Sequence, residues 1–268
     1  MGGPEAGDGS VEVSRTVHQA AERGFGAAAN AYERSRPGYP SEAIDRLIQE
    51  LELTRSCRAM DLGAGTGKLT RLLLPAGATL VAVEPVEAMR AEFASVLPEV
   101  RMVAGVAEVL PFADGTFDAV VCAQAFHWFD GDRALPEIHR VLKRWGRLGL
   151  LWNVRDESVQ WIRELTEIID PYERTAPREK THEWRRTFSA SDLFGRLNQL
   201  RFPHRQRLDR DGLVERFASV SFIASLPSEE RDAVLDRIRA LAEKHPDLAG
   251  PDGFDLPYVT ELYWCVKS

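Results

Sequence analysis

The chain has 268 residues, of which 44% are hydrophobic and 28% are charged, and its formal net charge is −7. This composition is typical of a soluble globular protein with one large domain, and the acidic balance argues against a dedicated nucleic-acid binder. No apolar run reaches membrane-spanning length, and the amino terminus lacks the basic and apolar regions of a signal peptide. We therefore predict a cytoplasmic protein that binds neither nucleic acid nor membranes.

The first half of the chain alternates between strand-like and helical patterns. Residues 1–20 are glycine-rich and polar, which predicts a disordered tail, and a helix is expected to begin at Ser41 after two prolines. Strands are expected at residues 58–62, 79–85, 100–106, 117–123 and 147–152, with helices over 86–96 and 132–144. Strands that alternate with helices predict a Rossmann-like α/β fold with a doubly wound, mostly parallel sheet.

The alternation is interrupted after residue 153. An amphipathic helix and a polar stretch occupy residues 155–200, a strand is expected at 202–208, a long helix capped by Ser228 follows, and a last strand covers 258–266. We expect residues 21–55 and 155–200 to form a cover over the carboxyl ends of the strands, within a single domain of residues 21–268.

Three glycines stand at alternate positions directly after the first predicted strand, in Asp61-Leu62-Gly63-Ala64-Gly65-Thr66-Gly67-Lys68. A dinucleotide-binding turn would need glycine at position 68, and a phosphate-binding loop would need glycine at 62 and Ser or Thr at 69. The chain meets neither requirement. The remaining pattern, acid-x-G-x-G-x-G, predicts a tight turn that lets a ligand approach the backbone at the carboxyl end of a strand.

A second acid, Glu84, ends the second predicted strand, 17 residues beyond Gly67. A carboxylate in this place can accept hydrogen bonds from both hydroxyls of a ribose. Glu84 therefore favours an adenosine-containing ligand without choosing among such ligands, and a solvated acid at the end of a strand is the alternative.

Several segments occur together in one order: Asp61-Leu62-Gly63-Ala64-Gly65-Thr66-Gly67, Val83-Glu84-Pro85-x-x-x-Met89, Gly105-x-Ala107-Glu108-x-Leu110-Pro111-Phe112 and Phe117-Asp118-x-Val120. They resemble class I S-adenosylmethionine-dependent methyltransferases that act on small molecules, such as biotin-pathway, ubiquinone-pathway and trans-aconitate enzymes. The stretches Phe25-Gly26-x-x-Ala29-x-x-Tyr32-x-x-x-Arg36-Pro37-x-Tyr39-Pro40 and Ala125-Phe126-His127-Trp128-Phe129 resemble the trans-aconitate-type branch in particular.

This resemblance implies a seven-stranded sheet whose last strand is antiparallel and inserted near the edge. It also implies transfer of a methyl group from S-adenosylmethionine to a small-molecule acceptor, with S-adenosylhomocysteine as the product. We expect the transfer at oxygen, with a carboxylate as one candidate acceptor.

The resemblance further implies which residues contact the cofactor. The turn residues would face its amino-acid part, Asp61 would order its ammonium, and Glu84 would bind the ribose. The other expected contacts are Gly63, Ala64, Gly65 and Gly67 of the turn; Pro85 and Met89 near the adenine; Ala107 and Glu108 at the adenine edge; Gln124 and Ala125 beside the methionine moiety; and Tyr32 and Arg36 closing over it.

His127 is the candidate catalytic residue, because it follows the fourth strand, where the family places the reactive methyl. A general base is needed only if the acceptor must lose a proton, so a structural or substrate-positioning role is the alternative. His182 and Trp184 are candidates for lining the acceptor pocket, with surface positions as the alternative. We expect no metal.

Two other functions are compatible with parts of the pattern. A nicotinamide-dependent oxidoreductase would share the ribose-binding acid, although Lys68 disfavours it. A methyltransferase fold that binds the cofactor without transferring its methyl group is the second alternative.

Overall fold

The computed structural model describes residues 36–173, 182–250 and 252–268. Its sheet has seven strands in the order β3-β2-β1-β4-β5-β7-β6. The strands are β1 Arg58–Leu62, β2 Thr79–Val83, β3 Arg101–Val103, β4 Phe117–Ala123, β5 Leu142–Arg155, β6 Asn198–Leu208 and β7 Phe254–Val266. Strand β7 is antiparallel to both of its neighbours, and β1 to β5 pair in parallel. The predicted Rossmann-like sheet with an antiparallel last strand near the edge is therefore confirmed.

Helices cover both faces of the sheet because the central strands are apolar on both sides. In β4, Val120 and Cys122 belong to one apolar cluster, whereas Ala119 and Val121 belong to another. The first cluster includes side chains of α6 (Gly131–Val141) and α8 (Trp184–Ser189). The second includes side chains of α3 (Ser41–Glu50), α4 (Lys68–Leu73) and α5 (Glu87–Val96).

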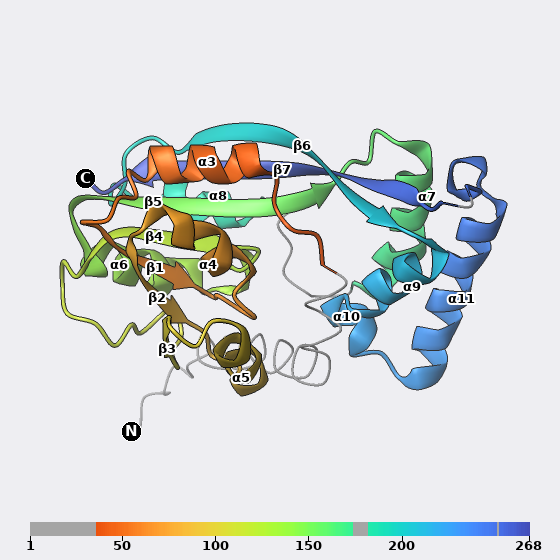
Figure 1. Ribbon diagram of the computed structural model, residues 1–268, viewed down its shortest axis with the longest axis horizontal. Helices are drawn as coiled ribbons and strands as arrows, with labels where there is room; N and C mark the ends of the chain where they lie inside the picture. Colours follow the sequence, from red (N-terminus) through yellow and green to blue (C-terminus); the bar gives the residue numbers. More distant parts are fainter. Residues whose placement is uncertain (1–35, 174–181, 251) are drawn as a thin grey trace, which may run out of the picture.

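A third apolar cluster lies at one end of the long strands, and we call the helices that form it the helical lobe. They are α7 (Gln160–Ile169), α9 (Arg210–Ala218), α10 (Ser221–Ala224) and α11 (Ser228–Lys244), which pack on the first residues of β7. Figure 1 shows this lobe beyond the ends of β5, β6 and β7, away from β1, β2 and β3. The molecule thus consists of an α/β body and a helical lobe joined by three long strands.

The structure corrects several element boundaries. Strand β5 begins at Leu142, which pairs with β4, so the helix expected over 132–144 ends earlier, and the strand continues to Arg155, where it pairs with β7. Strand β3 is shorter than residues 100–106, and β6 begins four residues before residue 202. Helices α3 and α11 begin at the expected serines, but their N-cap residues are prolines and no side chain caps either helix.

The two described α-helices of residues 155–200 pack in different parts of the molecule. Helix α7 packs in the helical lobe, whereas α8 packs beside α6 on one face of the sheet. These residues therefore do not form one unit in the described parts of the chain. Residues 21–35, the first part of the expected cover, lie outside the described residues, as does the expected tail.

Candidate active site

The glycine turn follows β1, and the backbone of β2 fixes its shape. The backbone N–H groups of Gly63 and Ala64 both donate to the carbonyl oxygen of Val83, at 2.8 and 3.1 Å. Gly63 has φ +73°, and a Cβ atom there would lie 2.6 Å from Cβ of Ala125. Gly65 has φ +56°, but a Cβ atom there would meet nothing within 4 Å. The first glycine is therefore needed for packing, whereas the second leaves open space above the turn.

Asp61 is the acidic side chain that precedes the glycine turn, and it is only 1% exposed. Its Oδ2 accepts a hydrogen bond from the hydroxyl of Thr70, while its Oδ1 has no hydrogen-bond partner among the described residues. Burial raises the pKa of Asp61 to about 7, although the Thr70 hydrogen bond opposes this shift. A buried carboxylate oxygen without a partner is costly, so this position favours a ligand that brings a hydrogen-bond donor or a positive charge.

Glu84 lies beside the turn and is held by two backbone groups. Its Oε2 accepts from the N–H of Gly65, and its Oε1 accepts from the N–H of Val86, both at 3.0 Å. Burial raises the pKa of Glu84, and these two hydrogen bonds lower it in part. A carboxylate oxygen can accept more than one hydrogen bond, so this geometry leaves capacity for a ribose.

A cavity of about 590 Å³, part of it open to solvent, lies above the glycine turn. The turn forms one wall, together with Lys68 and Leu69 at the start of α4. The ends of β4 and β5 contribute Gln124 and Asn153, so the cavity lies at the carboxyl ends of parallel strands.

The remaining walls come from the amino-terminal segment and from the helical lobe. Arg36, Pro37 and Tyr39 line the cavity, and so does Arg216 of α9. Arg36 donates to the carbonyl oxygen of Ser219 at 3.3 Å, which ties the amino-terminal segment to the end of α9. The cavity therefore lies between the α/β body and the helical lobe.

Gln124 shows backbone strain at the wall of this cavity. Its φ is +56°, in a region that residues other than glycine rarely adopt, and its N–H donates to the carbonyl oxygen of Leu151 at 2.8 Å. Strain of this kind costs about 1–3 kcal/mol and is often found at functional sites. It brings the backbone after β4 alongside the glycine turn.

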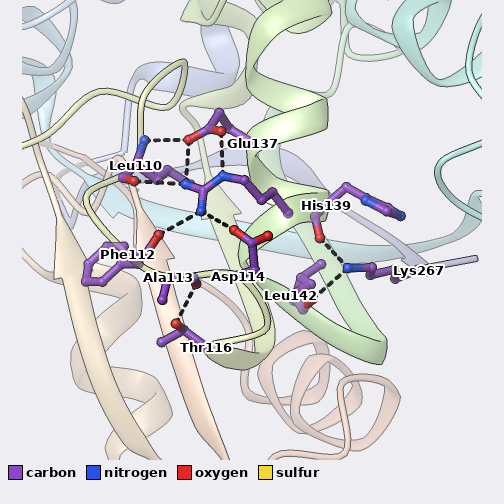
Figure 2. Close-up of polar contacts among 10 residues, drawn as sticks. Leu110, Phe112, Ala113, Asp114, Thr116, Glu137, His139, Leu142 and Lys267 are labelled. Carbon is purple, nitrogen blue, oxygen red and sulfur yellow. Dashed lines mark hydrogen bonds and ion pairs between the residues drawn. The ribbon is translucent and has the colours of Figure 1, made fainter.

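The loop between β3 and β4 carries the residues expected near the adenine, and α6 anchors it. Figure 2 shows Leu110 of this loop joined to Glu137 of α6 by a hydrogen bond, whereas Phe112 and Asp114 contact a second side chain of the same helix. Arg140 donates to the carbonyl oxygens of Leu110 and Phe112, at 3.0 and 2.8 Å, and to the carboxylates of Asp114 and Glu137.

Two further hydrogen bonds hold this loop. The N–H of Leu110 donates to Glu137, and Oε1 of Glu108 accepts from the N–H of Asp130, both at 2.8 Å. The hydrogen bonds from Arg140 hold the pKa of Glu137 below its usual value. The loop is therefore fixed at several points on α6 and at the residue that precedes it.

The structure groups some of the predicted site residues and separates others. Around the cavity it brings together Arg36, Asp61, Gly63, Ala64, Gly65 and Gln124. Ala125 and Gly67 flank the turn, while Glu84 reaches it through Gly65. Exposed Pro85 and buried Met89, Ala107 and Glu108 lie beyond the next strands and do not line the cavity. Tyr32 lies outside the described residues.

His127 lies in a short 3-10 helix after β4, and it does not line the cavity. Its Nδ1 accepts from Nε1 of Trp152 at 3.1 Å. Since indole nitrogen can only donate, a neutral His127 carries its proton on Nε2 and presents a donor there. This geometry disfavours a general base, and the catalytic role of His127 stays a prediction.

Neither of the two residues expected to line an acceptor pocket lines the cavity above the glycine turn. Trp184 is buried at 6% exposure, and its ring stacks on Trp152 with centroids 4.5 Å apart. His182 is exposed. Trp184 is instead part of an aromatic cluster that joins α8 to the sheet.

Sequence reasoning missed several polar residues of the cavity, among them Lys68, Asn153 and Arg216. Lys68 stands within the glycine motif, and Asn153 follows the fifth predicted strand, so their positions in the sequence could have identified both as site residues. Arg216 belongs to a helix that the sequence analysis did not predict, and nothing local ties it to the turn.

No group of three or more His, Cys, Asp or Glu side chains in residues 36–173, 182–250 and 252–268 could hold a metal ion. Within the same ranges, every helix is too short or too polar to cross a membrane.

Comparisons with known proteins agree with this geometry. A family model described as a methyltransferase domain matches residues 60–150. An uncharacterised methyltransferase of Mycobacterium tuberculosis is 42% identical over 248 residues, which cover 91% of this chain and 94% of that protein. Malonyl-[acyl-carrier protein] O-methyltransferase of Pseudescherichia vulneris is 31% identical over 135 residues, which cover 50% of this chain and 53% of that protein.

Solved structures share the fold at low sequence identity. A putative methyltransferase from an antibiotic biosynthesis pathway of Anabaena variabilis has a TM-score of 0.61 at 21% identity, covering 82% of this chain and 96% of that one. Geranyl diphosphate C-methyltransferase of Streptomyces coelicolor, solved with S-adenosyl-L-homocysteine, has a TM-score of 0.50 at 16% identity, covering 85% and 76%. With the relative from Mycobacterium tuberculosis, the family is shown: the chain is a class I S-adenosylmethionine-dependent methyltransferase.

Proposed function

We propose that the chain binds S-adenosylmethionine above the glycine turn and transfers its methyl group to an oxygen of a small anionic acceptor, with a carboxylate as the first candidate. The observation that carries this proposal is Asp61, a buried carboxylate whose Oδ1 has no partner among the described residues and which lines an open cavity. An ammonium group of a ligand would satisfy that oxygen.

The residues present fit the cofactor at three places. Asp61 suits the ammonium, the open space above Gly65 admits the amino-acid part, and Glu84 keeps capacity for ribose hydroxyls. The loop at Ala107 and Glu108, which a hydrogen bond to Glu108 holds at the start of α6, would carry the adenine contacts. The similar structure of geranyl diphosphate C-methyltransferase contains S-adenosyl-L-homocysteine, which supports the same ligand class here.

The cavity itself favours an anionic acceptor. Its ionisable lining side chains in the described residues are Arg36, Lys68 and Arg216, which are basic, and Asp61 and Tyr39. A carboxylate acceptor is already deprotonated and needs no general base, which agrees with the hydrogen bond at Nδ1 of His127. The name of the malonyl-[acyl-carrier protein] relative states transfer to oxygen.

The protein contributes position more than proton transfer. When bound, S-adenosylmethionine supplies an electrophilic methyl group on a sulfonium that leaves as a neutral thioether. The strained backbone at Gln124 and the glycine turn would hold the cofactor in one position, so that an acceptor oxygen could approach its methyl group. Alignment of two reactants in this way can contribute several kcal/mol to lowering the barrier.

The test is a transfer assay with methyl-labelled S-adenosylmethionine and a panel of carboxylic acids, phenols and amines. We expect labelled product and S-adenosylhomocysteine with at least one carboxylic acid, and we expect mild base to release the label as methanol, as for a methyl ester. Asp61→Asn serves as the matched control and should lose most of this activity. Base-stable product from amines or phenols alone would contradict the carboxylate proposal, whereas no binding of the cofactor would contradict the whole assignment.

A further inference from the structure

The helical lobe contributes a buried arginine, Arg216 of α9, to the wall of the cavity. Its side chain is 4% exposed, and it lines the cavity above the glycine turn. Its Nε donates to the hydroxyl of Tyr258 at 3.2 Å, and that hydroxyl in turn contacts Oε1 of Gln206 at 3.4 Å. These contacts hold the guanidinium in place from one side.

The other side of the guanidinium is not satisfied by the described protein. Its Nη1 is buried and has no hydrogen-bond partner among residues 36–173, 182–250 and 252–268. No carboxylate in these ranges pairs with Arg216, and Asp61 is the only acidic side chain among the described lining residues. A buried, unpaired charge destabilises a folded protein, so its presence beside a cavity indicates that a ligand supplies the negative group.

We infer that Arg216 is a carboxylate-binding residue of the active site, contributed by the helical lobe to a site that otherwise belongs to the α/β body. The planar fork of guanidinium donors matches the two oxygens of a carboxylate, and Tyr258 leaves Nη1 available for this pairing. The inference deepens the proposed function and rests on it for the identity of the ligand. The carboxylate belongs either to the methionine moiety of the cofactor or to the methyl acceptor, and both sources present the same chemistry.

The experiment compares wild type, Arg216→Met, Arg216→Lys and a control, Arg237→Met, on the exposed side of α11. Calorimetric titration measures the affinity for S-adenosylhomocysteine and for its decarboxylated analogue. Malonate, added with and without S-adenosylhomocysteine, serves as a simple carboxylate probe in thermal unfolding. The melting temperature of each variant without ligand reports on folding.

If the carboxylate is that of the cofactor, Arg216→Met weakens S-adenosylhomocysteine about tenfold or more and leaves the decarboxylated analogue unchanged. If it is that of the acceptor, S-adenosylhomocysteine binds equally well, and the stabilisation by malonate is lost in Arg216→Met. In both cases the ligand response of Arg216→Lys lies between those of wild type and Arg216→Met. Without ligand, Arg216→Met melts no lower than wild type, because the substitution removes an unpaired buried charge.

Equal affinities and equal malonate responses in wild type and Arg216→Met would overturn the inference. So would a large fall in the melting temperature of Arg216→Met without ligand while ligand binding is unchanged, because Arg216 would then be structural. If wild type binds no S-adenosylhomocysteine, the proposed function fails, and the malonate response alone then decides the role of Arg216.

Discussion

The α/β body and the helical lobe meet at one cavity, but they are built in different ways. In the body, the backbone carries the site: a glycine turn, the strained Gln124 and the ends of parallel strands. The lobe contributes one side chain, Arg216, from a helix whose other buried residues form a separate apolar cluster. The body therefore determines the chemistry of the cofactor site, whereas a substitution at Arg216 would change the part of the cavity that the lobe forms and leave the glycine turn unaltered.

The comparison predicts the largest effect for Gly63→Ala in the body. The new Cβ would combine a φ of +73° with a contact 2.6 Å from Cβ of Ala125. We expect the free energy of unfolding to fall by about 4–5 kcal/mol, and binding of S-adenosylhomocysteine to be lost. Chemical denaturation checks this, with Gly38→Ala as the control because its Cβ would meet nothing within 4 Å. A stability equal to that of the control would show that the turn tolerates a side chain.

In the lobe, Ile238→Ala should affect stability without affecting the cofactor. Ile238 is fully buried in the apolar cluster of α11, so the substitution leaves a cavity that costs about 2–5 kcal/mol. Because α11 does not line the site, the affinity for S-adenosylhomocysteine should stay within about twofold of wild type. The milder Ile238→Val should lose about 0.5–1.5 kcal/mol. A large loss of affinity in either variant would mean that the lobe and the body act as one unit.

Asp61→Asn should separate stability from binding in the body. Since burial raises the pKa of Asp61 from 3.8 to about 7, the folded state binds more protons than the unfolded state between these pH values. This group therefore lowers stability as the pH rises from about 4 to about 7, and Asp61→Asn should be about 2–4 kcal/mol more stable than wild type at pH 8.

The same variant makes a prediction for the ligand. The affinity of wild type for S-adenosylhomocysteine should fall as the pH falls below about 7, because protonated Asp61 attracts an ammonium less. Asp61→Asn should bind weakly at every pH. Denaturation and titration between pH 5 and 8 test both parts, and parallel pH profiles of the two proteins would contradict the assigned role.

A smaller effect is expected for Arg140→Gln, which removes the anchor of the loop between β3 and β4. Five hydrogen bonds are lost, but the side chain is partly exposed, so we expect destabilisation by about 1–3 kcal/mol. Affinity should fall a few-fold for S-adenosylhomocysteine and not for methionine, because this loop carries the expected contacts of the adenine. Arg144→Gln, at an exposed position nearby, is the control and should match wild type. Equal effects of the two variants would argue against the anchor.

How much the sequence revealed also differs between the two regions. Strands β1 and β4 and the glycine turn are local patterns, and their predicted ranges agree with the structure. The last residues of strand β5 were not predicted, because they pair with β7, more than 100 residues away in the chain. Arg216 could not be predicted, since only tertiary packing brings α9 to the turn. Likewise, the polar stretch around Trp184 could not show that its ring is stacked on Trp152.

The most direct test of the account is calorimetric titration of wild type and Gly65→Ala with S-adenosylhomocysteine and with NAD. The account predicts one S-adenosylhomocysteine site per chain, no NAD binding, and at least about tenfold weaker S-adenosylhomocysteine binding by Gly65→Ala. The variant should lose only about 1 kcal/mol of stability, because its Cβ enters open space and meets only backbone strain. Equal affinity of the two proteins, or binding of NAD in place of S-adenosylhomocysteine, would contradict the claim that the cofactor lies above this turn.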